Sequence, residues 1–418
     1  MVCATKLNYH VILASNKRGT EMPGVRDKVA IIGMGCTKFG EHWDKDVGDL
    51  IVEACYEAFE DAGVEPKDVQ AAWLGTAWSG ELGRTLAYPL KLDYIPVTRV
   101  ENRCASGHDA FINACYAVAC GAFDLVLVCG AEKLKDTGLP IPGDYNPTTL
   151  YTSRVDTGYL PATAWAIFAL RYFHHYGIPV EEGRRILAKI AVKNHYNGFL
   201  APKAQFHRRI TIEDALNAPI IAWPLGLYDA CGITDGAAAA IITRADLAKN
   251  YRDDYVLVKG VGMSSGIYQG QVMDDWPLVR IEENVRAPKM AYAEAGIKNP
   301  RKELDLAEVH DCFTIHELVI YEDLGFSPRG KAREDVEAGT FELKGELPVN
   351  TDGGLKCFGH PLGASGIRMI YEVYKQLKGK ADQRQVEIRN QMGLTHTCGG
   401  TPVDAHTAAV AILGLRGA

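Results

Sequence analysis

The sequence lacks the features that define several large classes of protein. It has no C-x-x-C pair among its 11 cysteines, so we expect no structural zinc site. It has no apolar run of the ~18 residues that a transmembrane helix requires, so we expect no membrane contact. Lys and Arg number 45 against 52 Asp and Glu, and the net charge of −7 argues against a nucleic-acid partner.

The two ends of the chain also lack sorting signals. Residues 1–26 form a polar extension without the apolar region of a secretory signal, and Arg416-Gly417-Ala418 is not a peroxisomal tripeptide. The 11 cysteines have no regular spacing, which is typical of a reducing compartment where thiols serve as small buried apolar groups. We therefore expect a cytoplasmic protein, and its 418 residues indicate two or three domains.

What the chain does contain is a repeated pattern. An apolar run that ends in glycines occupies 29–35 and recurs at 256–262, and each run precedes a helical pattern that stops at a glycine. Later, each half has a helix that opens on Ala-Ser-Gly, at 105–107 and at 364–366. This alternation predicts an α/β fold of two similar halves, with mostly parallel sheets covered by helices.

An insertion separates the two halves. Residues 145–228 hold 13 of the chain's 37 aromatic residues, and an insertion this long is more often a functional lid or binding loop than a linker. The alternative is that these rings form a small core of their own. The predicted parts are an N-terminal extension (1–26), an N-terminal half (27–130), an inserted loop domain (131–225), a return to the N-terminal half (226–250) and a C-terminal half (251–418).

Cys104 is the first candidate for chemistry. It lies in Asn102-Arg103-Cys104-Ala105-Ser106-Gly107, just before a predicted helix. The positive end of a helix dipole would lower the pKa of this thiol and favour the thiolate. The small residues after it would let a substrate approach the sulfur. The alternative is that Cys104 is one more packed thiol.

His360 occupies the equivalent position in the second half. It lies in Gly-His-Pro-Leu-Gly-Ala-Ser-Gly (359–366), and Pro361 is the residue expected at the first position of a helix. An imidazole at a helix start is held neutral, as a base for a thiol must be. The alternative is a histidine that only caps the helix.

Two further candidates follow strand-like runs. Cys398 lies after 386–394 and before two glycines, where a thiol is open to substrate and backbone N–H groups can stabilise an oxyanion. His310 ends a predicted strand and would face the carboxyl ends of a parallel sheet, where α/β proteins bind ligands. Its neighbour Asp311 is expected to be a cap or an ion-pair partner. Cys312 and Phe313 are expected to pack in the core.

These residue types together predict acyl transfer on a thiol. One thiol would be the nucleophile, a histidine would activate it, and the other thiol would shuttle a proton. At these positions the chain resembles the thiolase superfamily, over about 27–418. The match is most specific at Cys-Ala-Ser-Gly (104–107), at 359–366 and at Cys-Gly-Gly (398–400). His-Asp-Cys-Phe at 310–313 resembles the sterol-carrier-protein branch, whereas most other thiolases carry Asn-Glu-Ala-Phe there.

The resemblance implies a role for each residue. Cys104 would take the acyl group after activation by His360, and Cys398 would add or remove the proton at the α-carbon of the acyl-CoA. His310 and His360 would point at the thioester oxygen of the enolate. The backbone N–H groups of Cys104 and Gly400 would hold the oxyanion of the acyl-enzyme step.

The resemblance also implies a fold and partners. The family fold is a five-layer sandwich of two similar α/β halves, with an inserted loop domain that covers coenzyme A. Acyl-CoA and CoA would be substrates, with no permanently bound cofactor or metal. A homodimer or a dimer of dimers is expected. A small zinc-ribbon/OB-fold protein is a candidate partner, because archaeal and bacterial members of the branch often work with one.

The expected activity is CoA-dependent cleavage of a 3-oxoacyl-CoA, a reversible Claisen condensation. The aromatic insertion and the His310 motif favour a longer, branched or aromatic acyl chain, since buried rings discriminate between short and bulky groups. Relatives that cleave benzoylsuccinyl-CoA are an example. A biosynthetic acetoacetyl-CoA thiolase is the alternative, in which the same rings only pack the loop domain.

Three other classes compete with this interpretation. Gly33-Met34-Gly35 after a strand is typical of a Rossmann dehydrogenase, but the spacing to Gly40 does not complete G-x-G-x-x-G. A decarboxylating or 3-hydroxy-3-methylglutaryl-type condensing enzyme would not need Cys398. A non-catalytic acyl-CoA-binding subunit would not need Cys104 or His360.

Overall fold

The computed structural model describes residues 24–137, 161–266, 276–402 and 406–418. The predicted N-terminal extension (1–26) therefore lies almost wholly outside the described residues. Within these ranges, nine strands form one sheet in the order β3-β2-β4-β7-β1-β8-β11-β10-β9. The strands are β1 (Val29–Cys36), β2 (Ala71–Gly75), β3 (Val97–Val100), β4 (Leu125–Lys133), β7 (Asp235–Arg244), β8 (Val256–Ser265), β9 (Leu306–Glu308), β10 (Met392–Gly399) and β11 (Thr407–Gly414).

Helices precede or follow most of these strands, and a two-stranded ribbon of β5 (Ile220–Ala222) and β6 (Leu225–Gly226) stands apart from the sheet. The helices are α1 (Val47–Ala62), α2 (Arg84–Leu90), α3 (Ser106–Ala119), α4 (Pro161–His175), α5 (Val180–Phe199), α6 (Ile212–Leu216), α8 (Glu282–Ala295), α9 (Pro300–Glu303), α10 (Thr314–Asp323), α11 (Ala332–Glu337), α12 (Gly354–Phe358) and α13 (Leu362–Leu377).

Most neighbouring strands run antiparallel, so the expectation of mostly parallel sheets is wrong. The pairs β2–β3, β2–β4 and β9–β10 are parallel, and the other neighbouring pairs are antiparallel. Residues 400–406 join β10 to β11, and so short a connection permits only an antiparallel neighbour. Strand β7 returns from the insertion in the direction opposite to β1 and β4, and it lies antiparallel to both.

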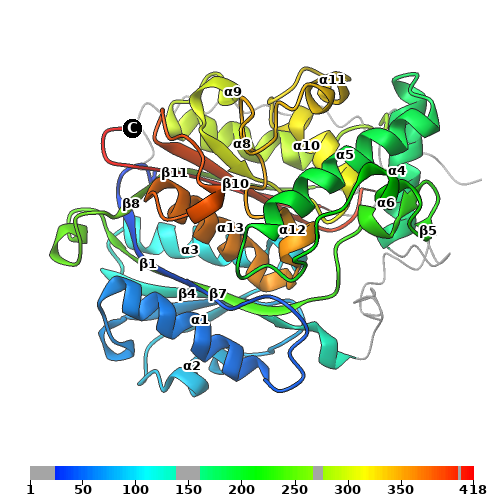
Figure 1. Cartoon of the computed structure of the whole chain (residues 1–418). Coiled ribbons are helices and arrows are strands. Elements are labelled where there is room, and N and C mark those ends of the chain that lie inside the picture. The colour runs from blue at the N-terminus through cyan, green and yellow to red at the C-terminus, as the bar shows by residue number, and fades with distance from the viewer. Residues whose placement is uncertain (1–23, 138–160, 267–275, 403–405) are drawn as a thin grey trace, which may run out of the picture.

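Three layers of helices alternate with the two halves of the sheet (Figure 1). Helices α1 and α2 cover the outer face of the first half, α3 and α13 lie between the halves, and α8 covers the outer face of the second half. Three buried apolar clusters correspond to these layers. One lies under α1, one surrounds α3 and α13, and one lies under α8 and extends to α4 and α10. The predicted five-layer sandwich of two α/β halves is confirmed.

The glycines that mark the repeat let a helix lie directly on a strand. A Cβ atom on Gly33 would lie 2.4 Å from the Ala58 carbonyl oxygen of α1. One on Gly262 would lie 2.0 Å from the Ala287 carbonyl oxygen of α8. Helix α1 begins only at Val47, well beyond the end of β1. Gly33 therefore allows a helix to pack closely on the strand and does not lie at a helix start that could bind a pyrophosphate. This removes the basis of the dehydrogenase alternative.

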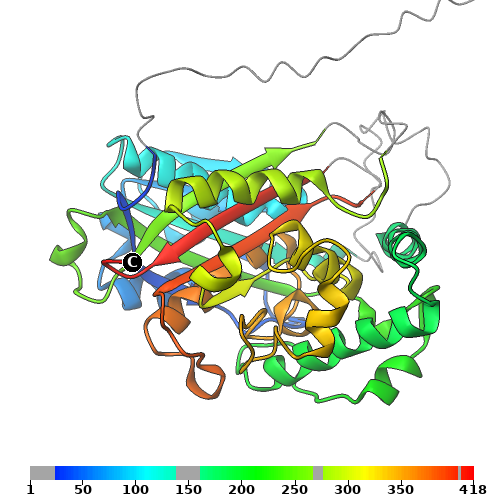
Figure 2. The same ribbon diagram turned by 90° about the horizontal axis from the view of Figure 1, so that it is seen from above.

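The described part of the inserted segment lies at one end of the sandwich, and its residues 138–160 lie outside the described residues. Helices α4, α5 and α6 lie there beside α10 and α12 (Figures 1 and 2). On α4, Trp165, Phe168, Tyr172 and Phe173 are buried in the cluster that continues under α8, together with Leu318 of α10. These four rings therefore belong to the core of the second half. The predicted domain limits stay a prediction.

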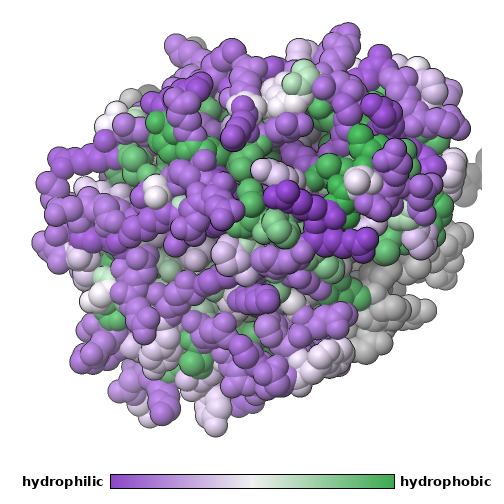
Figure 3. All heavy atoms as spheres, in the orientation of Figure 1, coloured by the Kyte–Doolittle hydropathy of each residue, from purple (hydrophilic) through white to green (hydrophobic). Residues whose placement is uncertain are grey.

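The surface agrees with the charge composition. On the face shown in Figure 3, hydrophilic side chains predominate and hydrophobic groups show in separate areas between them. No helix among the described residues is both long and apolar enough to cross a membrane.

Candidate active site

A tight turn positions Cys104. It lies in a 3-10 turn (Arg103–Ala105) that leads directly into α3. The Ser106 hydroxyl accepts the Asn102 backbone N–H at 2.9 Å and donates to the Arg103 carbonyl at 2.5 Å. The Asn102 amide also donates to Asp109 at 2.6 Å. Because these contacts fix both sides of the turn, the half-buried thiol has a defined direction.

The protonation state of Cys104 differs from the expectation. Burial raises the pKa of the Cys104 thiol to about 12, with a smaller upward contribution from the Cys231 thiol, while Arg103 lowers it. The predicted lowering of this pKa is therefore wrong. Helix α3 begins only at Ser106, so its first N–H groups offset little of the cost of burying a thiolate. Cys104 is a thiol at rest and needs a base.

Small residues bring the turn of Cys104 against the turn of His360. A Cβ atom on Gly107 would lie 2.3 Å from the Gly363 carbonyl oxygen, so the first turns of α3 and α13 touch through glycine. A Cβ atom on Gly399 would lie 2.2 Å from the Asn102 carbonyl oxygen. The end of β10, with Cys398, therefore also reaches this point.

The hydrogen bonds of His360 leave its Nε2 as a free base. Its Nδ1 lies 2.8 Å from the Ser365 hydroxyl, which donates its own proton to the Pro361 carbonyl at 2.9 Å. Ser365 must therefore accept from Nδ1–H, which leaves the lone pair on Nε2. That Nε2 is buried without a hydrogen-bond partner among the described residues. Burial, with a smaller contribution from Arg368, lowers the pKa of His360 to about 3. The predicted neutral form is confirmed, although burial holds it there more than the helix start does.

His310 presents the opposite tautomer. Its Nδ1 accepts the backbone N–H of Cys398 at 3.4 Å, so the proton of the neutral ring lies on Nε2. Burial lowers the pKa of His310 well below its usual value, and His360 adds to this effect. The ring centroids of His310 and His360 are 5.1 Å apart, and the ring planes are nearly perpendicular at 89°. The Cys104 sulfur and one ring nitrogen of each histidine all lie within 4.8 Å of one another.

Cys398 is more deeply buried than Cys104. It lies within β10 and not after a strand at 386–394, as the sequence pattern predicts. Its side chain is about 1% exposed, and burial raises the pKa of the thiol well above its usual value. The Cys398 sulfur lies 3.4 Å from Nε2 of His316, which is buried in α10.

His316 is the residue that the sequence interpretation missed. It lies in the first turn of α10, and its Nδ1 lies 3.7 Å from the sulfur of Cys312, which precedes that helix. Cys312 is buried as expected but also contacts this histidine, so its role goes beyond packing. The His-Asp-Cys-Phe-Thr-Ile-His run at 310–316 was the available signal.

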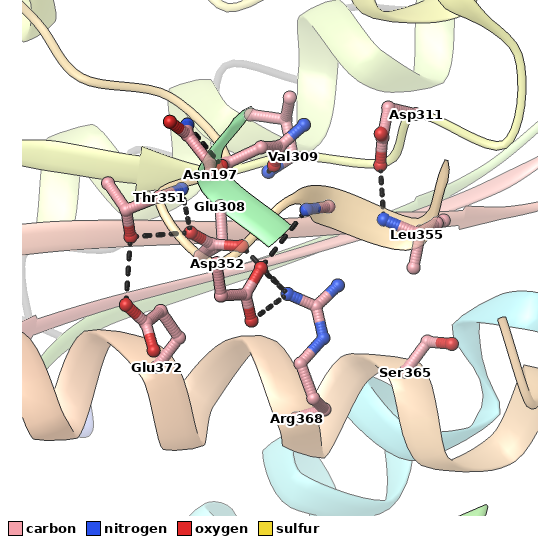
Figure 4. A network of polar contacts seen from close by, with 12 residues as sticks. Asn197, Glu308, Val309, Asp311, Thr351, Asp352, Leu355, Ser365, Arg368 and Glu372 are labelled. Carbon is pink, nitrogen blue, oxygen red and sulfur yellow. Dashed lines mark hydrogen bonds and ion pairs between the residues drawn. The ribbon is translucent and has the colours of Figure 1, made fainter. Parts of the chain in front are cut away.

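A buried ionic network supports the segments that carry His310 and His360 (Figure 4). Arg368 of α13 pairs with Glu308 of β9 at 2.8 Å and with Asp352 at 2.6 Å, and all three side chains are fully buried. Asp311 accepts the Leu355 backbone N–H at 2.6 Å, so it caps the start of α12. The expectation of a cap at Asp311 is confirmed. Burial raises the pKa of Asp311 to about 7, and the Glu317 charge adds to this effect.

Two other site assignments are less directly defined. Gly400 follows β10 with a φ of 112°, a conformation that favours glycine, and its N–H as an oxyanion donor stays a prediction. The side chains of Cys104, His310 and His360 are close enough to hold a metal ion, as are those of His310, Cys312 and His316.

Comparisons with known proteins agree with this geometry. Residues 29–246 match the family model of the thiolase N-terminal domain, and residues 267–414 match the thiolase C-terminal domain-like model. The acetyl-CoA acetyltransferase of Methanothermobacter thermautotrophicus is 40% identical over 92% of this chain and 98% of its own length. The chain belongs to the thiolase family.

Further relatives place this thiolase in the sterol-carrier-protein branch. The benzoylsuccinyl-CoA thiolase subunit BbsB of Thauera aromatica is 32% identical over 89% of this chain and 95% of its own length. The Ltp2–ChsH2(DUF35) aldolase has a similar structure, with a TM-score of 0.80 and 27% identity over 93% of this chain and 98% of that chain. This thiolase is thus an acyltransferase that uses coenzyme A as a substrate and needs no permanent cofactor.

Proposed function

We propose that this thiolase cleaves a 3-oxoacyl-CoA with coenzyme A through an acyl-enzyme on Cys104. The observation that carries the proposal is the pair of opposite tautomers next to the sulfur. His360 presents a bare Nε2, which can take the thiol proton, and His310 presents Nε2–H, which can donate to an oxygen. The Cys104 thiol has a raised pKa and therefore needs the base that His360 presents. An enolate oxygen needs the hydrogen-bond donor that His310 presents.

The steps follow from these positions. The S–H bond of Cys104 breaks as its proton moves to Nε2 of His360, and the sulfur electron pair forms an S–C bond to the 3-oxo carbon. Collapse of the tetrahedral oxyanion breaks the bond between C2 and C3, and that electron pair becomes the enolate of the departing acyl-CoA. His310 stabilises the enolate oxygen, and Cys398 supplies a proton to C2. CoA thiol then attacks the acyl-enzyme and brings in the proton that restores the enzyme.

Mass spectrometry tests this proposal directly. After incubation with an acyl-CoA and rapid acid quench, peptide analysis should locate the acyl group on Cys104. An acyl group on Cys398 would reverse the two thiols, and a protein that forms no adduct with any acyl-CoA would contradict the function.

For the acyl chain, we propose a longer, branched or aromatic group. The support comes from Trp165, which differs from the other rings of α4. Its buried ring lies 4.1 Å from that of His316, whose Nε2 contacts the Cys398 sulfur, and 6.0 Å from that of Phe313. An aromatic wall there would favour a bulky acyl group, and the similarity to a benzoylsuccinyl-CoA thiolase subunit is in keeping with it.

Acetoacetyl-CoA is the second candidate substrate. The similarity to an acetyl-CoA acetyltransferase favours it, as does the burial of Phe168, Tyr172 and Phe173 in the core. Values of kcat/KM for acetoacetyl-CoA and for an aryl 3-oxoacyl-CoA decide between them. A preference of tenfold or more for acetoacetyl-CoA, about 1.4 kcal/mol in transition-state binding, would overturn the bulky substrate.

We also propose a cytoplasmic homodimer or dimer of dimers that works with a small zinc-ribbon/OB-fold protein. The support for the partner is the similarity to an aldolase whose name joins Ltp2 to ChsH2(DUF35). The mass of the purified protein in solution, alone and with a co-expressed candidate partner, tests both statements. A monomer that gains neither mass nor activity would contradict them.

A further inference from the structure

The Cys398 thiol contacts a histidine that the steps above do not use. His316 lies in α10, and its Nε2 is 3.4 Å from the Cys398 sulfur. Both side chains are buried, His316 fully and Cys398 to about 1% exposure. A sulfur and an imidazole nitrogen at this distance form an S–H···N hydrogen bond when the nitrogen carries a lone pair.

The neighbours of His316 show that Nε2 is the lone-pair nitrogen. The Asn284 amide donates to His316 Nε2 at 3.4 Å, and its carbonyl oxygen lies 3.0 Å from Nε2 of His396. The proton of the His316 ring is therefore on Nδ1, which faces the Cys312 sulfur at 3.7 Å. In this arrangement the Cys398 thiol and the Asn284 amide both point a donor at the one lone pair on Nε2, each at 3.4 Å, and Nδ1–H faces a sulfur.

The packing around His316 holds the ring in place. The Trp165 ring of α4 lies against the His316 ring, with centroids 4.1 Å apart. The centroid of the His310 ring lies 5.2 Å from that of His316. Burial lowers the pKa of His316 well below its usual value, and the nearby histidines add to this effect. The thiol and the imidazole are thus both neutral at rest, and the proton between them is shared through a hydrogen bond.

We propose that His316 is the positioning residue and proton acceptor of Cys398, so that the two side chains form one acid/base unit. This inference rests on the proposed function. In the condensation direction the S–H bond breaks, the proton forms an N–H bond on His316 Nε2, and the electron pair stays on sulfur. That pair then takes the α-proton of the acyl-CoA, and the C–H electrons become the enolate. The proton on His316 then leaves with the CoA thiol that condensation releases. In the cleavage direction Cys398 gives its S–H proton to C2 of the enolate, and the CoA thiol supplies the proton that restores the Cys398 thiol.

The test separates the two half-reactions. Wild-type protein in deuterated water should exchange the α-protons of its acyl-CoA product and should form the acyl-enzyme. His316→Gln should acylate Cys104 normally but lose α-proton exchange by about 10²-fold or more, the usual range for general acid–base catalysis. The pH profile of exchange should also change, which a purely structural role would not cause.

His108→Gln is the matched control. His108 is another fully buried histidine beside β10, and its ring contacts the hydroxyls of Thr397 and Thr395 at 2.8 and 2.7 Å instead of a thiol. This variant should keep the ratio of exchange to acylation, even where its stability falls. A His316→Gln variant that keeps wild-type exchange would overturn the inference, as would a folded variant in which acylation and exchange fall together.

A second measurement requires no change at His316. In protein labelled with [15N]histidine, Cys398→Ala should shift one unprotonated ring-nitrogen signal, because Nε2 of His316 loses the thiol donor and keeps only the Asn284 amide. His310 keeps its donor, because that donor is the backbone N–H of residue 398. An unchanged spectrum would contradict the Cys398–His316 contact. Failure of the wild type to form any acyl-enzyme would instead contradict the proposed function.

Discussion

The two thiols of the site lie in contrasting surroundings, although each has an imidazole close by. Cys104 is half-buried in a turn before a helix, and His360 beside it is oriented by the hydroxyl of Ser365. Cys398 is fully buried within a strand, and His316 beside it faces a second thiol, Cys312. A nucleophile must admit the carbon that it attacks, whereas a group that moves a proton needs only a path for that proton. The difference in burial therefore matches the difference in proposed role.

Removal of the half-buried thiol, Cys104, is expected to have the largest effect. Cys104→Ser should abolish the acyl-enzyme and lower turnover by about 10³-fold or more, since the nucleophile acts as a unit with its base. Thiolysis assays and mass spectrometry measure both. Cys120→Ser is the control, because that thiol lies at the far end of α3 and is exposed. Undiminished turnover in Cys104→Ser would show that Cys104 is not the nucleophile, so the two thiols would not differ in role as proposed.

Removal of the buried thiol should separate the half-reactions. Cys398→Ala is expected to keep acylation of Cys104 but to lose exchange of the α-protons by about 10²–10⁴-fold, since only the acid/base group is missing. Exchange into deuterated water followed by proton NMR measures the loss. Normal exchange with failed acylation would assign the roles the other way round.

The ionic network beneath both histidines is expected to contribute to stability. Arg368→Met leaves the buried carboxylates of Glu308 and Asp352 without their cation, and it should lower the free energy of unfolding by about 3–5 kcal/mol. Denaturant unfolding measures this change. Arg389→Met removes an exposed pair with Glu387 and should leave the free energy of unfolding almost unchanged. If both variants lost the same free energy of unfolding, the buried network would stabilise the fold no more than an exposed ion pair does.

The smallest effect is expected from loss of the hydrogen bond between Ser365 and His360. Ser365→Ala removes the acceptor that holds the proton on Nδ1 of His360, leaving a buried donor unpaired. A loss of about 1–3 kcal/mol in transition-state stabilisation is expected in kcat/KM for acylation, with α-proton exchange affected less. Thr243→Ala removes a hydroxyl that bonds the Asp124 carbonyl and serves as the control. If Ser365→Ala reduced α-proton exchange more than acylation, His360 would act in the exchange half-reaction and not in acylation.

The sequence allowed prediction of the residues that lie in recognisable motifs. Cys104, His310, His360 and Cys398 all come from short runs of small residues or from strand ends, and the structure brings them together. His316 was missed because one histidine in an apolar helical run looks like any buried residue. Asn284 was missed for the same reason, since it lies in α8 and meets His316 only through the fold.

The sequence by itself determined the duplication and the family, because apolar periodicity and short motifs are local properties of the chain, and the five layers followed only from the resemblance to that family. Tertiary structure alone decided three other features. The direction of the strands depends on where each connection returns, which periodicity does not record. The pKa of Cys104 depends on burial by distant segments, which outweighs the helix dipole. The tautomers of His310 and His360 depend on single hydrogen bonds, to the Cys398 N–H and to the Ser365 hydroxyl. These features are interactions between residues far apart in the chain or in precise spatial register, so only the folded molecule could reveal them.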